Sequence, residues 1–298
     1  MKSLSAEKPT LKGNGTKSGR GVISRSISTS SHVTACTDPS AKDGLDFDDR
    51  SVAEVHVIHL PRAKARKKFF LTMNRSPDVR WIFEEGVDSR TLDFQKLKAE
   101  NLVQAGTRFR TPGCSLAHRK LWLKAAKAAA PFIICEDDVV FRKDFPLQLK
   151  SCLGRLPEGW DIFFLGYNFD GTLDVDIIGG IEYFKGRFFN QQQKRLEAAE
   201  LKQFSNMTLP VGVLPLINVF GTPAYVLSPK GAEFLLKHVF PLRNCRVTFR
   251  ASGRVVAAHT MDTIMNKYYC EMKAYVSLPP LAVTPNIKDP EAQIVMIH

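Results

Sequence analysis

The sequence predicts an α/β fold with a mainly parallel central sheet. Short apolar runs rich in β-branched and aromatic residues recur along the chain, and segments of helical composition follow most of them. Such alternation is typical of sheets whose parallel strands are joined by crossover helices. With 298 residues, of which 44% are hydrophobic, the chain is long enough to bury a sizeable core.

The first half of the chain supplies two strands and two helices to this prediction. Residues 55–60 predict a buried strand, and Pro61 is expected at the first position of a basic helix that runs over 62–70. A second strand is expected at 81–83. The stretch 115–130, rich in Ala, Leu and Lys, predicts a helix that ends at the proline following it.

The second half continues the alternation around one irregular region. We expect strands at 132–135, 160–166 and 224–227 and a helix at 230–238. Between them, residues 169–215 have no clear period and are interpreted as an insertion or lid. An amphipathic helix is predicted inside this region, near 191–204.

The composition of the N-terminal region and the hydropathy of the chain predict the domain boundaries and the cellular location. Residues 1–50 lack hydrophobic periodicity, so we expect a disordered basic tail followed by one domain over 51–298. The first 35 residues lack an apolar signal segment, and their Ser-, Lys- and Arg-rich composition faintly resembles an organelle transit peptide. No apolar run reaches the roughly 18 residues of a membrane span. The prediction is a cytoplasmic protein, with targeting by the tail left open.

The net charge limits the classes of binding partner that we expect, and the cysteine spacing bears on disulfides and metal sites. The formal net charge of +12 predicts anionic partners, a class that includes nucleotides, phosphorylated glycans, anionic membrane surfaces and nucleic acid. The basic residues are dispersed and form no recognition motif, so specific nucleic-acid binding is not expected. The six cysteines are scattered and none forms a C-x-x-C pair, which predicts reduced thiols and no structural zinc site.

Three consecutive carboxylates, Glu136, Asp137 and Asp138, follow directly on an apolar strand. They repel one another there, and a divalent cation would relieve that repulsion; hard oxygen ligands suit Mg²⁺ or Mn²⁺. Ligands of open α/β sheets bind beyond the carboxyl ends of strands, where this triplet is expected. A cation held there could neutralise a departing nucleoside diphosphate. The alternative is a solvated turn that ends in a helix-capping acid.

The junction between the first strand and the basic helix is a second candidate site. Backbone N–H groups at a helix start attract phosphate, and Arg62 could clamp the phosphate in bidentate fashion. Asp88 follows a strand and could bind a ribose hydroxyl, or else it forms a turn. We expect an ordinary solvated face from the basic residues after the junction, which are Lys64, Arg66, Lys67 and Lys68.

Two histidines have partners at helical spacing. His118 and Trp122 are four residues apart and share a helix face, a pattern that indicates core packing more often than a ligand. His259 and Asp262 are three apart and could supply a late metal ligand or a general base, with a structural role as the alternative.

Taken in order, these motifs resemble glycosyltransferase family 25, which includes bacterial lipooligosaccharide galactosyltransferases and procollagen galactosyltransferases. The resemblance spans roughly residues 53–285. Each motif alone is a weak signal, and the resemblance is specific because the motifs occur in the same order as in the family. The matching pieces are Val57-Ile58-His59-Leu60-Pro61-Arg62, Val87-Asp88, Gly113-Cys114 with His118 and Trp122, Glu136-Asp137-Asp138-Val139, Trp160-Asp161-Ile162 with Leu165-Gly166, Gly221-Thr222 with Ala224-Tyr225, Lys230-Gly231-Ala232 and Pro279-Pro280-Leu281-Ala282.

The resemblance implies a GT-A type fold with a nucleotide-sugar site, a UDP-sugar donor, most often UDP-galactose, Mn²⁺, and inversion at the anomeric carbon. It makes Glu136, Asp137 and Asp138 the metal and diphosphate motif, with Asp138 as the first-choice ligand. It places Pro61, Arg62, Asp88 and His118 on the donor side. Because an inverting transfer needs a base beside the acceptor hydroxyl, Asp262 is assigned that role, with His259 as the rival.

The sequence departs from the family pattern near the glycine–cysteine pair. Ala117 stands where the family commonly has Ser before the motif histidine, and Thr111-Pro112 replaces the usual acid and aliphatic residue. These departures permit a second hypothesis, a non-catalytic binding protein that keeps the fold; a basic nucleic-acid-binding protein is the third. The expected acceptors are a glycan, a lipooligosaccharide reached through transient contact with an anionic membrane surface, or hydroxylysine.

Overall fold

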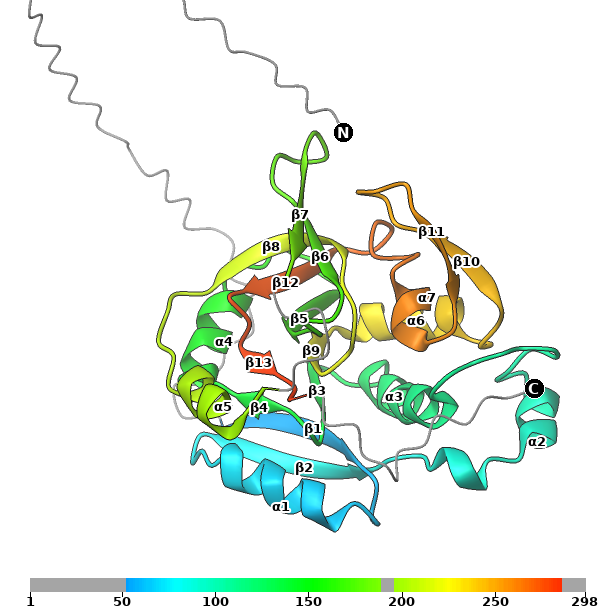
Figure 1. Cartoon of the computed structure of the whole chain (residues 1–298), viewed down its shortest axis with the longest axis horizontal. Helices are drawn as coiled ribbons and strands as arrows, with labels where there is room; N and C mark the ends of the chain where they lie inside the picture. The colour runs from blue at the N-terminus through cyan, green and yellow to red at the C-terminus, as the bar shows by residue number, and fades with distance from the viewer. Residues whose placement is uncertain (1–51, 189–195, 286–298) are drawn as a thin grey trace, which may run out of the picture. The chain divides into compact units, whose positions relative to one another are not determined.

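The computed structural model describes residues 52–188 and 196–285. Within them, the main sheet follows the order β2-β1-β3-β9-β5-β12-β8-β6-β7, and β13 joins it between β5 and β4 (Figure 1). Its strands are β1 Ala53–His59, β2 Val79–Glu85, β3 Phe132–Glu136, β4 Val140–Phe141, β5 Ile162–Gly166, β6 Thr172–Asp176, β7 Tyr183–Arg187, β8 Gly212–Asn218, β9 Ala224–Leu227, β12 Ala274–Leu278 and β13 Ala282–Val283. The tail predicted over 1–50 lies outside the described residues.

The helices and a second small sheet complete the fold. Strands β10 Cys245–Thr248 and β11 Val255–Ala258 pair as an antiparallel hairpin apart from the main sheet. The helical elements are α1 Lys64–Met73, η1 Ser89–Thr91, α2 Phe94–Ala99, α3 Pro112–Ala125, α4 Phe145–Leu153, α5 Ala198–Ser205, α6 Pro229–Val239 and α7 Met261–Met265. No helix among the described residues has the length and apolar character that crossing a membrane requires.

Strand direction confirms the predicted α/β class and refines it. Strand β1 pairs in parallel with β2 and β3, and β5 pairs in parallel with β12. Strand β9 is antiparallel to both β3 and β5, so these five strands all run in one direction around a single reversed neighbour. Beyond β12 the pairing becomes antiparallel through β8, β6 and β7. From β2 to β12 five of six strands share one direction, and the sheet as a whole is mixed, which is consistent with the GT-A type of fold.

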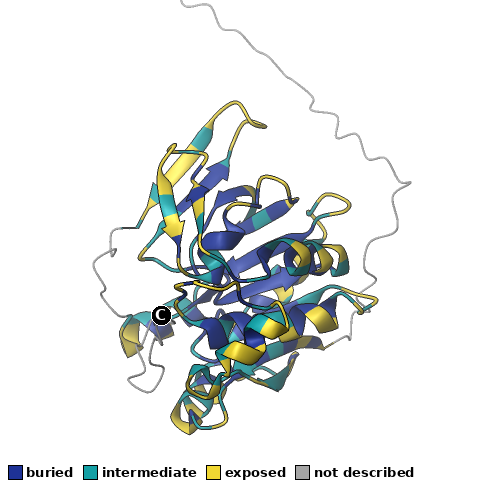
Figure 2. Ribbon diagram, turned by 90° about the vertical axis from the view of Figure 1, so that its right-hand side faces the viewer, coloured by how far each residue is buried: buried dark blue, intermediate teal, exposed yellow. Residues whose placement is uncertain are grey.

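The core lies on both faces of the sheet, because side chains alternate along each strand. On one face Ile134, Phe164 and Tyr225 pack with residues of α3, α6 and α7. On the opposite face Cys135 and Phe163 pack with residues of α1 and α4. Figure 2 shows the buried residues gathered along the central strands and the exposed ones on outer helices and hairpins.

Two helix predictions are corrected by the structure. Helix α1 begins at Lys64, and Pro61 lies in the preceding turn, where the N–H of Ala63 donates to the Leu60 carbonyl over 2.8 Å. Pro61 is therefore not at the first helical position. Helix α3 runs over Pro112–Ala125 and is earlier at both ends than the predicted 115–130. It starts earlier because Pro112 itself occupies the first turn.

The irregular region 169–215 contributes to the sheet. It contains β6, β7 and the first residues of β8, and β6 pairs with both neighbours. The helix predicted near 191–204 is observed as α5, Ala198–Ser205, and residues 189–195 lie outside the description. A role for this region as an insertion or lid stays a prediction.

Candidate functional site

A cleft of about 210 Å³ opens at the carboxyl ends of β1 and β3, where parallel strands of an α/β sheet present ligand sites. We call it the carboxylate cleft. Four of the predicted site residues line it together, namely Arg62, Asp88, Glu136 and Asp137. The rest of its lining is Ile58, Leu60, Arg66, Gly86, Val87, Ser89, Thr111, Cys114 and Ala117.

Asp137 is the most enclosed member of the acidic triplet. Its Oδ2 lies 2.6 Å from Nδ1 of His59, the last residue of β1, and its Oδ1 forms an ion pair with Arg66 of α1. Burial raises the pKa of Asp137, while Arg66 and His59 act in the opposite direction. Arg66 also lies 3.3 Å from Oδ2 of Asp138. The arginine therefore balances part of the triplet's charge, which corrects its assignment to a solvated face.

Asp138 has the chemistry of a cation ligand. Its Oδ1 is buried and has no hydrogen-bond partner within the described residues. Burial, together with the charges of Glu136 and Asp137, raises the pKa of Asp138 to about 6 against the pull of Arg66. A carboxylate oxygen that is buried without a partner is costly, and a divalent cation would satisfy it. The Asp138 carboxylate therefore suits a hard cation such as the predicted Mn²⁺ or Mg²⁺, and the use of Asp138 and Glu136 together as its ligands stays a prediction.

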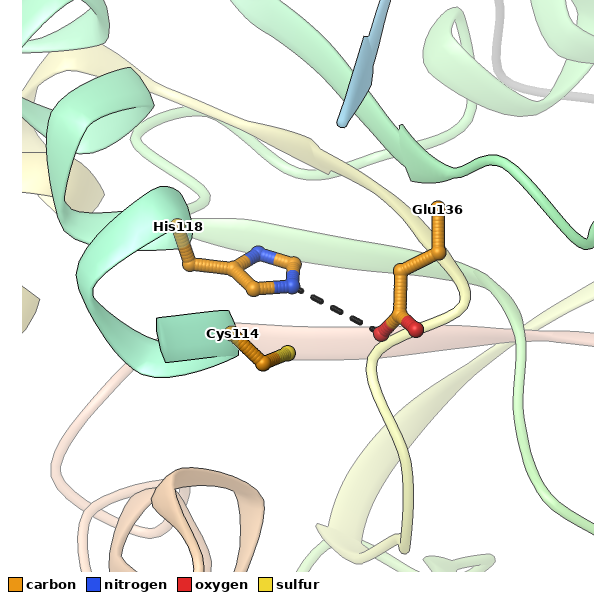
Figure 3. A group of neighbouring side chains, drawn as sticks. All are labelled: Cys114, His118 and Glu136. Atoms are coloured by element: carbon orange, nitrogen blue, oxygen red, sulfur yellow. Dashed lines mark ion pairs between the residues drawn. The ribbon is translucent and has the colours of Figure 1, made fainter. Parts of the chain in front are cut away.

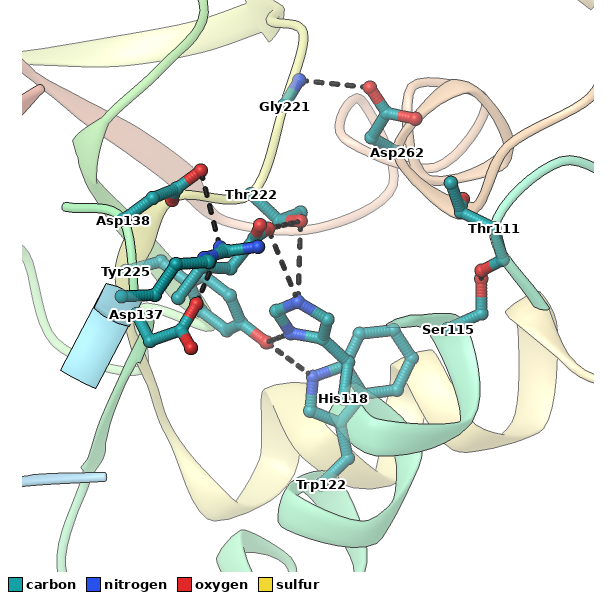
Figure 4. Close-up of polar contacts among 12 residues, drawn as sticks. Thr111, Ser115, His118, Trp122, Asp137, Asp138, Gly221, Thr222, Tyr225 and Asp262 are labelled. Carbon is teal, nitrogen blue, oxygen red and sulfur yellow. Dashed lines mark hydrogen bonds and ion pairs between the residues drawn. The ribbon is translucent and has the colours of Figure 1, made fainter. Parts of the chain in front are cut away.

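Glu136, at the end of β3, is held by a polar network of His118, Trp122, Thr222 and Tyr225, which Figure 4 shows. Thr222 Oγ1 donates to Glu136 Oε1 over 3.1 Å, and Nε2 of His118 lies 3.6 Å from the same oxygen. Nδ1 of His118 lies 2.8 Å from the hydroxyl of Tyr225, which also accepts a hydrogen bond of 2.7 Å from Trp122 Nε1. Burial opposes ionisation of Glu136, but His118, with Arg66 and Thr222, lowers its pKa below the usual range.

The start of α3 brings this network to the sheet because of Gly113. Its N–H donates to Ser89 Oγ over 3.0 Å, and a Cβ at this position would lie 2.3 Å from the Val87 carbonyl oxygen. Only glycine allows the first turn of the helix to approach the 87–89 segment so closely. Further along the helix, His118 and Trp122 are fully buried, as the shared-face pattern predicts, and both contact Tyr225.

Arg62 and Asp88 meet at the outer side of the carboxylate cleft. Arg62 Nε donates to Asp88 Oδ2 over 2.8 Å, and Arg90 donates to the same carboxylate. The contact with Arg90, together with Arg62, holds the pKa of Asp88 well below its usual range. Asp88 also caps η1 by accepting from the Arg90 N–H, so the turn-forming interpretation describes its contacts. Pro61 lines a neighbouring lysine-rich groove beside α1 and is not among the residues of this cleft.

Asp262 lines a second cleft, of about 410 Å³, which we call the hairpin cleft. Two hairpins, β6–β7 and β10–β11, contribute to its lining, and the first turn of α7 supplies Asp262. The N–H of Gly221 donates to Asp262 Oδ2 over 2.9 Å. The other lining residues are Asn168, Asp170, Gly171, Thr172, Lys185, Arg187, Phe220, Phe249, Ser252, Arg254, Thr260 and Thr263.

His259, the rival to Asp262, lies outside the lining of both clefts. It is exposed, and its Nδ1 lies 3.3 Å from the carbonyl oxygen of Arg108. The structure therefore does not bring the two members of the late pair together as a catalytic unit, although they are only three residues apart. Residues three apart lie side by side only when both belong to one helix, and α7 begins after His259, at Met261.

The segment between β8 and β9 joins the two clefts. Gly221 holds Asp262 (Figure 4), and the next residue, Thr222, holds Glu136. Gly221 has φ of +81°, and a Cβ there would lie 2.4 Å from the side chain of Asn168, so the position requires glycine. Two consecutive residues, one through its N–H and one through its hydroxyl, thus each hold a carboxylate that lines one of the clefts.

Arg66 and His59 are partners of the acidic triplet that were not predicted from the sequence. Arg66 looks like one of several solvated cations on a basic helix, and no local signal distinguishes it from its neighbours. The histidine carried a weak signal, since it ends a buried strand whose parallel neighbour, β3, ends at Glu136, directly before Asp137. Parallel pairing brings the two strand ends together, a relation that the sequence alone does not establish.

Comparisons with known proteins agree with the resemblance. The pattern of glycosyltransferase family 25, described as LPS biosynthesis protein, matches residues 52–249. Procollagen galactosyltransferase 2 of Homo sapiens is 24% identical over 143 residues, which cover 43% of this chain and 22% of the relative. The Mus musculus protein of the same name gives the same identity and coverage. The chain thus spans about a fifth of the length of these curated relatives.

Solved structures give distant likenesses only. The inositol-1-phosphate CTP transferase from T. maritima is 12% identical with a TM-score of 0.33, over 82% of this chain and 93% of that one. UDP-glucose pyrophosphorylase from Leishmania major, a point mutant in complex with UDP-glucose, is 11% identical with a TM-score of 0.27, over 76% and 62%. The match to the family pattern covers well over half of the sequence, and the chain belongs to glycosyltransferase family 25.

Proposed function

We propose that this chain transfers galactose from UDP-galactose to a hydroxyl of an acceptor, with inversion and with a divalent cation, Mn²⁺ or Mg²⁺. Family membership supports glycosyl transfer, and the names of the two curated relatives support galactose as the sugar. Candidate acceptors are a glycan, a lipooligosaccharide or the hydroxylysine of a collagen-like chain.

The observation that carries the proposal is the link between the two clefts through Gly221 and Thr222. A direct transfer needs a donor site and an acceptor base on opposite sides of one reacting carbon. Here consecutive residues hold Glu136 in the carboxylate cleft and Asp262 in the hairpin cleft. Two clefts whose carboxylates are held by neighbouring residues suit a displacement in which donor and acceptor enter from different sides.

The carboxylate cleft is the proposed donor site. Asp138 and Glu136 would hold the cation, which would neutralise charge that develops on the departing diphosphate. Arg62 and Arg66 line or border the same cleft, and guanidinium groups bind phosphate oxygens well. His118, Thr222 and Tyr225 act as positioning residues that fix the orientation of Glu136 before the donor arrives. Asp137, paired with His59 and Arg66, anchors the strand end.

The hairpin cleft is the proposed acceptor site, with Asp262 as general base. Because the Gly221 N–H holds Oδ2, the carboxylate orientation is set and Oδ1 can receive the proton of the acceptor hydroxyl. Phe220 and Phe249 lie in contact, with ring centroids 5.3 Å apart, and both line the cleft. Aromatic faces of this kind are suited to stacking against a sugar or a peptide side chain.

A donor screen tests the proposal. The purified chain is incubated with Mn²⁺, a panel of UDP- and GDP-sugars and simple hydroxyl acceptors, and released nucleoside diphosphate is measured. We expect release from UDP-galactose above the other donors, and its loss on addition of EDTA. Equal release from every donor would contradict the galactose assignment. Absence of release, together with no effect of UDP and Mn²⁺ on thermal stability, would favour a non-catalytic protein.

A further inference from the structure

Cys114, His118 and Glu136 converge (Figure 3), and two of them, Cys114 and Glu136, line the carboxylate cleft. Cys114 and His118 are one helical turn apart on α3, and Glu136 ends β3. One potential ligand atom from each, Sγ, a ring nitrogen and a carboxylate oxygen, lies within 4.8 Å of the other two. The proposed donor site uses Glu136 but gives the thiol and the imidazole no role as ligands.

We propose that these three residues form a site for a thiophilic divalent cation, with Zn²⁺ as the expected occupant. Thiolate, imidazole and carboxylate are the ligands that zinc takes in proteins, in tetrahedral geometry. Bond lengths of about 2.0–2.3 Å place two ligands of one tetrahedral zinc roughly 3.4–3.6 Å apart. His118 Nε2 and Glu136 Oε1 are 3.6 Å apart in the structure. Three protein ligands leave a fourth position to water on the cleft side.

The surroundings of His118 favour its use as a ligand. Trp122 Nε1 can only donate, so the Tyr225 oxygen accepts from it. Without a cation, Tyr225 O–H can donate to Nδ1 of His118, 2.8 Å away, and Nε2–H can donate toward Glu136. Cation binding takes the other tautomer, in which Nδ1–H donates to the Tyr225 oxygen and Nε2 offers its lone pair to the metal. A metal-binding histidine is characteristically held in this way through its other nitrogen. The network therefore supplies an outer shell as well as three ligands.

This site has consequences for the proposed donor cation. Mn²⁺ and Mg²⁺ prefer the oxygen ligands of Asp138 and Glu136, whereas the Cys114 thiol selects a softer ion. Binding converts the thiol to a thiolate and releases one proton to solvent. Because Glu136 belongs to both ligand sets, Zn²⁺ at the thiophilic site and a cation at Asp138 compete for one carboxylate. The inference goes beyond the proposed function, and it can be tested without any transfer reaction.

Cobalt provides the test, because Co²⁺ replaces Zn²⁺ and a cobalt–thiolate bond gives a charge-transfer band in the near ultraviolet. Untagged full-length protein is titrated with Co²⁺ under reducing conditions, and Zn²⁺ is then added. We expect one Co²⁺ per chain with a thiolate band, which Zn²⁺ abolishes by displacement. Cys114→Ser should lose the band. Cys270→Ser, a change at an exposed cysteine outside the site, is the matched control and should keep it.

Two further variants separate this site from the donor cation site. Asp138→Asn should keep the thiolate band, since Asp138 belongs only to the oxygen-ligand site. Glu136→Gln, at a partly exposed position on the cleft wall, should keep the band but weaken Co²⁺ binding at least about tenfold. Cobalt binding without a thiolate band, a band that persists in Cys114→Ser, or unchanged affinity in Glu136→Gln would each overturn the proposal.

Discussion

The carboxylate cleft and the hairpin cleft hold their acidic residues by different means. In the carboxylate cleft, Glu136 and Asp137 are fixed by side chains from four separate elements, and much of that network is fully buried. In the hairpin cleft, Asp262 is held by one backbone N–H, and three cations of the lining, Lys185, Arg187 and Arg254, are exposed.

This difference indicates which half of the reaction is built into the core. A buried, satisfied polar network orients its members before any ligand binds, and that orientation lowers the reorganisation needed on binding. Hairpins and loops can change length and sequence with little effect on the core. We therefore expect the carboxylate cleft to set the donor and the hairpin cleft to set the acceptor.

The largest effect is expected from Asp262→Asn. The amide keeps the shape of the side chain but cannot take a proton, so transfer should fall by up to about 10⁴-fold. Initial rates at saturating donor and acceptor provide the measurement. Asp170→Asn, a carboxylate in the lining of the same cleft, is the control and should leave the rate within a fewfold of wild type. Equal losses in both variants would contradict a specific role for Asp262.

Asp138→Asn should reduce transfer by about 10³-fold, because a cation would lose its first ligand on the donor side. The reduced affinity for Mn²⁺ can be measured by titrating activity against the cation. Asp78→Asn, at an exposed position before β2, is the control. If the variant needed no more Mn²⁺ than wild type, Asp138 would not be a ligand.

Tyr225→Phe tests the buried network that distinguishes the carboxylate cleft. Loss of the hydroxyl leaves Trp122 Nε1 and His118 Nδ1 without their partner, which should cost about 2 kcal/mol of unfolding free energy and about 5 °C in Tm. Tyr269→Phe is a matched control, since the Tyr269 hydroxyl is buried without a hydrogen-bond partner among the described residues. That variant should be as stable as wild type or more so. If thermal denaturation gave a lower Tm for Tyr269→Phe than for Tyr225→Phe, the stabilising role of the network would be refuted.

The cations of the hairpin cleft should have smaller effects. Lys185→Ala or Arg187→Ala should raise the KM for an anionic acceptor by up to about fivefold, since exposed charges contribute little each. The KM for the donor should stay the same, because these residues do not line the carboxylate cleft. An increase in the donor KM alone would reverse the assignment of the two clefts.

The smallest effect concerns pH and β6, the strand that carries the outer hairpin. Burial raises the pKa of Asp174, opposed by Lys185, so the folded protein binds this proton more tightly than the unfolded chain does. The contribution of Asp174 to the free energy of unfolding therefore falls as the pH rises above about 4. Asp174→Asn should raise Tm by about 2 °C at pH 7.5 and leave it unchanged near pH 4. If the Tm difference between Asp174→Asn and wild type grew as the pH was lowered, the predicted pH dependence would be contradicted.

The sequence predicts the central strands well because their signal is local. Residues 132–135 and 224–227 are short, apolar and bounded by polar or turn residues, and both form strands. The acidic triplet was also visible, since carboxylates directly after a buried strand are unusual. Strand direction has no such signal: nothing in residues 224–227 shows that β9 runs against its neighbours.

The site residues that escaped prediction depend on contacts distant in sequence. Arg66 reaches the triplet only because β1 pairs with β3 and α1 follows β1, an arrangement fixed by tertiary packing. Thr222 and Gly221 gain their importance from Glu136 and Asp262, each about 40 or more residues away. Short-range patterns identify such residues as parts of a turn and give no indication of which carboxylate each one holds.

The most direct test of the two-cleft account is calorimetric titration of UDP in the presence of Mn²⁺ into wild type, Asp138→Asn and Asp262→Asn. The account predicts that Asp262→Asn binds UDP with the affinity of wild type while its transfer is lost, and that Asp138→Asn loses at least about tenfold in affinity. Equal loss of UDP affinity in both variants, or in neither, would contradict the separation of a donor cleft from an acceptor cleft.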